Sequence, residues 1–213
     1  MRYNLIIVAC SSSKDLIRLT EECIASALKD GADLEITVVE TSKHYPYNAN
    51  VVMYSGAFNY NRALNLGISL SRECDIYILA NNDIKFHLGW SVIGQAMLDS
   101  GFGSASALSN KHRGIVPGNF IYAGYNIGVF LTGWCIFATS QTIKTIGKLD
   151  ETYDFWCSDN VYGDQLKLAG IKHGLFCNIR VDHIENATLK TVPLRTRKNY
   201  TLHSLNKYQY NGS

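Results

Sequence analysis

Short apolar runs alternate with helical patterns over the first 80 residues of the chain. Residues 3–9 (YNLIIVA) and 34–40 (LEITVVE) are β-branched runs typical of strands that are buried on both faces. Between them, apolar residues recur at helical spacing from Leu16 to Leu28, after serines that can cap a helix and before Gly31, which can end one. This order predicts a βαβ unit with two parallel strands.

The same alternation continues to residue 83. Residues 57–71 predict a second helix, and residues 76–80 (IYILA) predict a third strand. A βαβαβ half of this kind binds its ligands beyond the carboxyl ends of its strands, which here are residues 10–13, 40–42 and 81–83. The last of these ends is Asn-Asn-Asp, for which a simple turn is the alternative interpretation, because Asn and Asp bond their own backbone.

Beyond residue 100 the pattern changes. Stretches rich in Gly, Tyr and β-formers predict shorter, partly antiparallel strands, and residues 140–147 and 160–170 predict helices. Residues 174–181 predict a strand that delivers Asp182 and His183. We therefore expect a single α/β domain with a mainly parallel central sheet and a smaller mixed or antiparallel portion. Residues 188–213 show little periodicity and are expected to form a tail or a segment that wraps the domain.

Composition fits a globular protein that acts in a reducing compartment. The 213 residues are 46% hydrophobic and 18% charged, and the formal charge of +2 is too small to indicate nucleic-acid or membrane binding. The six cysteines form no C-x-x-C pair, and the absence of H-E-x-x-H argues further against a zinc site. The first residues lack a signal-peptide cleavage pattern, and no apolar stretch approaches a membrane span. We expect a cytoplasmic protein.

Several segments in a fixed order carry a family resemblance. They are NRALNLGI (61–68), ILANND (78–83), GKLDETYDFWCSDN (147–160) and VDHIENAT (181–188). This arrangement resembles the inverting GT-A glycosyltransferases of the large family 2-like group that uses nucleotide-diphosphate sugars. In that group, D-x-D or N-x-D ends the third strand, G-G-F-D-E and E-D follow, and a later strand ends in His. The resemblance implies a GT-A domain over residues 1–187, with a nucleotide-sugar-binding half (1–100) and an acceptor and catalytic half (101–187).

Such a reaction releases a diphosphate, whose growing negative charge a divalent cation offsets. Mg²⁺ and Mn²⁺ prefer carboxylate oxygens, and Mn²⁺ also accepts imidazole. We therefore expect Asp83 and His183 to hold Mn²⁺ or Mg²⁺, although an ordinary strand-end histidine is the alternative for His183. Asn81 carries no charge, and the resemblance assigns it to hydrogen bonding near the ribose.

The reaction also needs a base that takes the proton of the acceptor hydroxyl. The resemblance places this base at Asp159, the second residue of the E-D position, where Ser158 replaces Glu. The alternative is that Asp159 caps the helix that follows, although Ser158 could fill that role. Trp156, three residues before Asp159, is a candidate for acceptor binding.

The resemblance implies a nucleotide-diphosphate sugar as donor, with a UDP-sugar expected first. Arg62 and Asn65 are candidates for binding it, but they could equally pin their own helix. The full set of expected nucleotide-sugar-binding residues is Cys10, Ser11, Glu40, Arg62, Asn65, Asn81 and Asn82.

Two other functions remain open. A sugar nucleotidyltransferase would carry a glycine-rich loop with Arg and Lys after its first strand, whereas this chain has ACSSSKD (9–15) without glycine. A catalytically silent nucleotide-sugar-binding module would explain the neutral residues Asn81 and Ser158. The acceptor is expected to be a saccharide or glycoconjugate, and a modified nucleic-acid base is the less favoured alternative.

Overall fold

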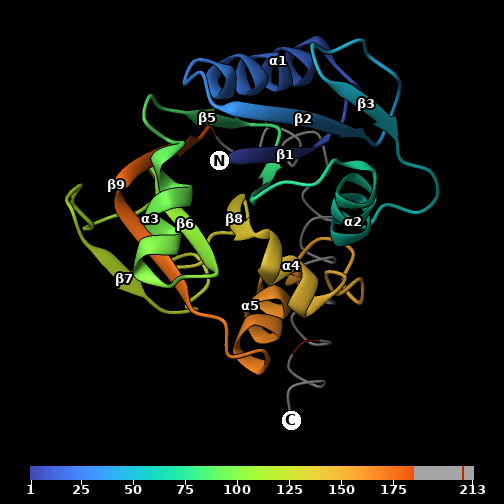
Figure 1. Ribbon diagram of the computed structural model, residues 1–213. Coiled ribbons are helices and arrows are strands. Elements are labelled where there is room, and N and C mark those ends of the chain that lie inside the picture. Colours follow the sequence, from blue (N-terminus) through green and yellow to red (C-terminus); the bar gives the residue numbers. More distant parts are fainter. Residues whose placement is uncertain (185–207, 209–213) are drawn as a thin grey trace.

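Three expected strands lie side by side in the computed structural model, which describes residues 1–184 and Tyr208 (Figure 1). Strand β1 (Arg2–Ala9) lies between β2 (Asp33–Glu40) and β4 (Ile76–Asn81) and runs parallel to both. Their neighbouring positions and parallel directions confirm the predicted βαβαβ half. A short fourth strand, β3 (Asn50–Met53), extends this parallel part at the edge beyond β2.

Helices cover both faces of this parallel part. Helix α1 (Lys14–Leu28) begins after Ser13, whose hydroxyl accepts a hydrogen bond from the backbone N–H of Leu16 at 3.3 Å. Helix α2 (Tyr60–Leu70) begins later than predicted, because Asn59 caps it. Alternate residues of β1 enter two different apolar cores, one with α1 and one with α2.

The second half adds antiparallel pairs to the same sheet, as the sequence predicted. The strand order is β3-β2-β1-β4-β8-β6-β9-β5, and β7 pairs with β9 outside this order. Strand β8 is antiparallel to both β4 and β6, whereas β6 and β9 are parallel. The elements of this half are β5 (Ile84–Phe86), α3 (Val92–Ser100), β6 (Ser104–Leu108), β7 (Ile121–Ala123), β8 (Cys135–Thr139), α4 (Ser140–Ile146), α5 (Ser158–Leu168) and β9 (His173–His183).

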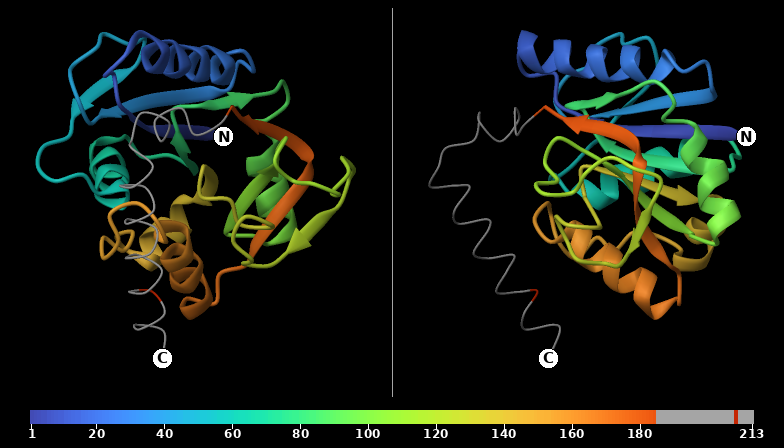
Figure 2. Two further views of the ribbon diagram at one scale, coloured as in Figure 1. Left: turned by 180° about the vertical axis from the view of Figure 1, so that it is seen from behind. Right: turned by 90° about the vertical axis from the view of Figure 1, so that its left-hand side faces the viewer.

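Helices α1 and α5 lie at opposite ends of the described structure (Figure 2). Strand β9 is longer than the expected 174–181 and includes both Asp182 and His183. All six cysteines are free. Among the described helices, none is long and apolar enough to cross a bilayer. The expected tail or wrapping segment, 188–213, lies outside the described residues except for Tyr208.

Candidate functional site

The strand end that carries Asn-Asn-Asp is both a turn and part of a cleft. Asn81 is the last residue of β4, and Asn82 and Asp83 form the turn that leads into β5. Strand β5 pairs with β9, and this pairing places Ile84 opposite His183. The backbone N–H of Ile184 donates to the carbonyl of Asp83 at 2.8 Å. The turn is thereby fixed against the end of β9.

Asp83 and His183 form a buried pair at this junction. Oδ1 of Asp83 lies 3.1 Å from Nε2 of His183, and the residues are only 4% and 8% exposed. The alignment is not that of a hydrogen bond, so both buried atoms lack a hydrogen-bond partner among the described residues. Trp134 stacks on the His183 ring, with centroids 5.0 Å apart and planes 12° apart. Buried polar atoms are nearly always satisfied, and this pair is therefore a candidate ligand site.

The pair fits a divalent cation. A carboxylate oxygen and an imidazole nitrogen are donors that Mn²⁺ accepts, and at 3.1 Å from each other both atoms could face one ion. Within the described residues there is no group of three or more His, Cys, Asp or Glu side chains that could hold a metal. An ion here would therefore complete its shell with water and substrate oxygens, as Mg²⁺ commonly does.

Asn81 is held by a buried tyrosine. The hydroxyl of Tyr60 donates to Oδ1 of Asn81 at 2.8 Å, and burial raises the pKa of Tyr60 far above its usual range. Tyr60 is therefore a permanent donor, and the amide N–H groups of Asn81 remain for a ligand. Asn82 points elsewhere: it is 4% exposed and donates to the hydroxyl of Thr20 in α1.

Asp159 lies in the first turn of α5. The N-cap is Cys157, which makes no side-chain capping bond, so neither Asp159 nor Ser158 fills that position. Cys157 has φ 68°, the one positive value among described non-glycine residues, and such strained conformations cluster at functional sites. Oδ1 of Asp159 accepts from the N–H of Asn160 at 3.0 Å. Burial raises the pKa of the Asp159 carboxyl.

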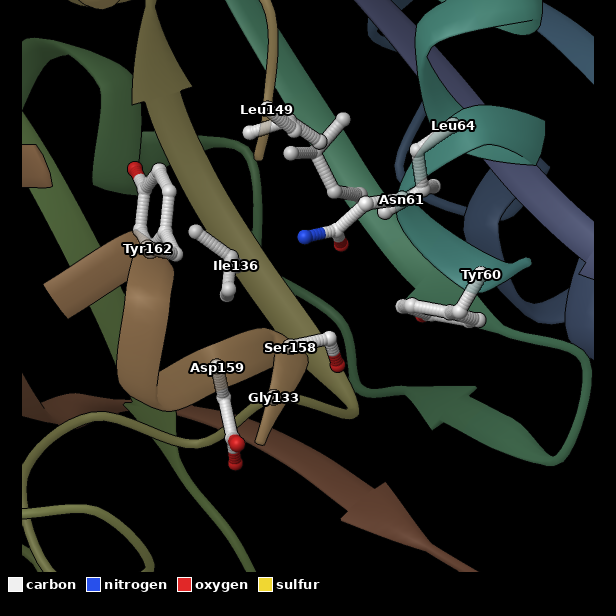
Figure 3. A pocket seen from close by; sticks show the side chains of 10 residues that line it. Tyr60, Asn61, Leu64, Gly133, Ile136, Leu149, Ser158, Asp159 and Tyr162 are labelled. Carbon is white, nitrogen blue, oxygen red and sulfur yellow. The ribbon is translucent and has the colours of Figure 1, made fainter. Parts of the chain in front are cut away.

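One cleft brings His183 and Asp159 together, whereas Asp83 lies behind His183 and does not line it. The cleft has a volume of about 130 Å³, and its walls include Asn81 and His183 as well as Asp159 and Trp156. Four residues expected in the site, from the ends of β4 and β9, the segment before α5 and α5 itself, therefore share one cleft. The remaining walls are formed by Tyr60, Gly133, Trp134, Phe155, Cys157 and Ser158. Figure 3 shows the smaller adjoining pocket, which shares Tyr60, Gly133, Ser158 and Asp159 with this cleft.

The ends of β1 and β2 are joined by a buried carboxylate. Glu40 is 0% exposed and accepts from the N–H and hydroxyl of Ser11 at 2.9 and 2.5 Å, and from the same groups of Ser42 at 2.9 and 2.8 Å. Ser11 is also fully buried, whereas Cys10 is partly exposed. Direct contact of Glu40 or Ser11 with a nucleoside does not fit this arrangement, because their polar atoms are already enclosed and paired.

Arg62 and Asn65 tie α2 to the segment that leads toward Asp159. The guanidinium of Arg62 pairs with Glu151 at 2.8 Å, and Asn65 exchanges hydrogen bonds of 2.9 Å with the backbone of Leu149. Neither residue lines the cleft. The alternative weighed from the sequence, that these residues pin their helix, describes their contacts in the structure.

Five cleft residues were not among the site residues expected from the sequence: Tyr60, Gly133, Trp134, Phe155 and Cys157. Tyr60 follows the cap of α2, and its partner on β4 becomes visible only when the two elements pack. Phe155 stands beside Trp156 in an aromatic pair that could have been singled out together. Gly133 carries no side chain, and nothing in its sequence context marks it.

Comparison with known proteins supports the fold. No protein-family model matches the chain, and no curated protein matches its sequence. Among solved structures, it is similar to GalNAc-T7 with UDP, GalNAc and Mn²⁺ (TM-score 0.71, 11% identity over 87% of this chain). It is also similar to S. aureus TarS (TM-score 0.63, 14% identity over 87% of this chain). The chain spans 43% and 37% of those chains, less than half of either. Both are GT-A glycosyltransferases, and the expected GT-A fold is confirmed.

Proposed function

We propose that this protein is a metal-dependent, inverting glycosyltransferase that moves a sugar from a nucleoside diphosphate to an acceptor hydroxyl. The observation that carries this proposal is the cleft that joins His183, from the unsatisfied Asp83–His183 pair, to the partly buried carboxylate of Asp159. A charge-neutralising site and a base are the two groups that the chemistry needs.

Asp83 and His183 would hold the cation, Mn²⁺ or Mg²⁺. The bound ion would supply the positive charge that offsets the charge developing on the leaving diphosphate. GalNAc-T7, a structure of the same fold, was crystallised with UDP and Mn²⁺, which supports a UDP-sugar as the first donor to test. The free amide N–H groups of Asn81 would donate to a donor oxygen, in agreement with a place near the ribose.

Of the other residues expected in the donor site, one would contact the nucleotide sugar and the others would support the surrounding loops. Cys10, partly exposed at the end of β1, would contact the nucleoside. Ser11, Glu40 and Asn82 would shape the strand-end loops, since their side chains bond within the protein. Through their contacts with residues 149–151, Arg62 and Asn65 would support the segment that leads to the base.

Asp159 would accept the proton of the acceptor hydroxyl as that oxygen attacks the sugar. Burial raises the pKa of the Asp159 carboxyl toward neutral pH, and a pKa nearer the working pH makes a carboxylate a better base. Attack on the sugar face opposite to the departing diphosphate inverts the configuration at the anomeric carbon. Trp156, on the same cleft wall, would contact the acceptor, for which a saccharide is the first choice and a nucleic-acid base the less favoured one.

The test is a panel of nucleotide sugars incubated with the purified protein, a saccharide panel and Mn²⁺ or EDTA. Release of a nucleoside diphosphate that depends on the metal and on one donor supports the proposal, and NMR of the product gives its anomeric configuration. A product that retains the donor configuration would overturn inversion. Metal-dependent binding without any turnover would favour the catalytically silent module, and release of pyrophosphate from a sugar phosphate and a nucleoside triphosphate would favour a nucleotidyltransferase.

A further inference from the structure

Gly133 lies against the side chain of Asp159 more closely than any other residue type would allow. A Cβ built on Gly133 would lie 2.8 Å from both Cβ and Oδ2 of Asp159 and 3.0 Å from its Cγ. Real Cβ contacts are essentially never this short. Figure 3 shows Gly133 beside Asp159 at the first turn of α5.

This contact cannot be relieved by turning a flexible side-chain tip. One of the closest atoms is Cβ of Asp159, which is fixed to the backbone of α5. The first turn of α5 is also fixed at its N-terminal end. Cys157 precedes it in a left-handed conformation, and the N–H of Val161 donates to the Cys157 carbonyl at 3.1 Å. A larger residue at 133 would therefore shift Asp159 as a whole.

We propose that Gly133 is a positioning residue, whose missing side chain leaves the notch in which the Asp159 carboxylate is held at the cleft wall. The catalytic role of this position rests on the proposed function, whereas the close contact between Gly133 and Asp159 is independent of it. The segment from Thr132 to Trp134 would serve two groups at once. Gly133 contacts the side chain of Asp159 and leaves room for its carboxylate, and Trp134 stacks on His183. The spacing between base and metal pair would thus be set by one short segment before β8.

The notch also places the carboxylate where the surrounding protein partly removes it from water. The adjoining pocket in Figure 3 is lined mostly by apolar side chains, among them Leu64, Ile136 and Leu149. Burial in this environment raises the pKa of Asp159. Displacement from the notch toward the water of the cleft would lower the pKa again.

The experiment compares Gly133→Ala with a matched control, Gly163→Ala. Gly163 lies in α5 itself, and a Cβ there would meet Leu131 at 3.5 Å, an ordinary contact. Carboxyl ¹³C NMR of aspartate-labelled protein follows the titration of Asp159, assigned with Asp159→Asn. We expect Gly133→Ala to lower the pKa of Asp159 and Gly163→Ala to leave it unchanged. An unchanged titration in folded Gly133→Ala would overturn the proposal.

Kinetics adds the catalytic part of the test. Gly133→Ala should lower kcat on the order of 10²-fold, since a misplacement of about 1 Å can cost this much, and should move the acid limb of the pH profile down. The KM for the donor should stay within twofold. If the parent transfers no sugar, the proposed function fails while the NMR result still decides the role of Gly133.

A double-mutant cycle covers the case in which Gly133→Ala does not fold. Asp159→Gly removes all three atoms that the new Cβ would meet. Urea unfolding should then show that Gly133→Ala costs much less stability in the Asp159→Gly background than in the parent. An equal loss in both backgrounds, or a double variant that does not fold, would show that Gly133 is needed for another reason.

Discussion

Oδ1 of Asp83 lies 3.1 Å from Nε2 of His183, although the two residues are far apart in the chain. The pairing of β5 with β9 produces this proximity, because Ile84 lies opposite His183. A carboxylate and an imidazole that face each other without a hydrogen bond are a poor stabilising contact and a good pair of metal ligands. Two predictions test this relationship directly.

Asp83→Ala should weaken Mn²⁺-dependent binding of UDP by at least tenfold, because one of the two proposed metal ligands is lost. Calorimetry with and without Mn²⁺ measures the effect. Asp99→Ala is the control. Asp99 is an exposed residue of α3, and its carboxylate accepts a hydrogen bond from the side chain of Gln95. UDP affinity equal to that of the parent would mean that Asp83 does not hold the ion.

Asn81→Asp should tighten Mn²⁺ binding by about tenfold, because a second carboxylate adds charge at the strand end. The Tyr60 hydroxyl can still donate to one oxygen of the new residue, as it donates to Asn81 now. The double variant Tyr60→Phe with Asn81→Asp, in the same calorimetric titration, separates the effect of the added charge from the effect of the Tyr60 hydrogen bond. No gain in Mn²⁺ affinity in either variant would place the ion away from Asn81.

The strands that frame this candidate site were predictable from the sequence, but most contacts within it were not. The β-branched runs and the helical spacing predicted β1, β2 and β4 as neighbours, and the rule for strand ends then pointed to Asn81 and Asp83. Asp83 and His183 were expected in one site, but β5 has only three residues, too few to show a period, so the strand pairing that brings them together was not predicted. The cap expected on α5 was placed wrongly, because Cys157 occupies the N-cap.

Glu40 marks another limit of the sequence. An acidic residue at the end of β2 is a plausible nucleoside ligand, and only the packed structure shows that donors from two loops enclose it. No periodicity could reveal this, because Ser11 and Ser42 come from different connections. The same holds for Gly133, whose role depends on a neighbour in α5.

Glu40→Gln should therefore lower stability more than it lowers nucleotide affinity. The amide keeps one acceptor oxygen, but its NH₂ group faces N–H and O–H groups that also donate. We expect the free energy of unfolding to fall by about 2–4 kcal/mol, because a buried charged acceptor with several partners is lost. Urea unfolding measures the loss, and UDP titration at a temperature where the variant is folded measures binding. Unchanged stability with weakened UDP binding would instead indicate direct contact with the nucleoside.

Acid should destabilise the protein through His173. This residue is 1% exposed, its ring contacts Ser104 and the carbonyl of Phe130, and burial lowers its pKa from 6.5 to about 4. Between these values the unfolded chain binds one more proton, so the free energy of unfolding falls as pH falls. The slope is about 1.4 kcal/mol per pH unit, which amounts to about 3 kcal/mol from pH 6.5 to pH 4.

Urea unfolding at several pH values between 4.5 and 7.5 measures this slope in the parent and in His173→Gln. The variant should lose stability at neutral pH and show a shallower slope toward acid. Burial also lowers the pKa of His112, so part of the slope should remain. The same acid slope in both proteins would show that His173 does not carry the effect.

Asp159→Asn tests whether Asp159 is the base of the proposed reaction. Asparagine keeps the size of the side chain and an oxygen that can accept from the N–H of Asn160, but its amide takes up no proton at neutral pH. The measurement is the transfer rate at saturating donor, made together with the melting temperature and the affinity for UDP and Mn²⁺. We expect the rate to fall by about 10²–10⁴-fold while stability and affinity stay unchanged. A rate within a few-fold of the parent would contradict the account, because Asp159 would then serve only the start of α5.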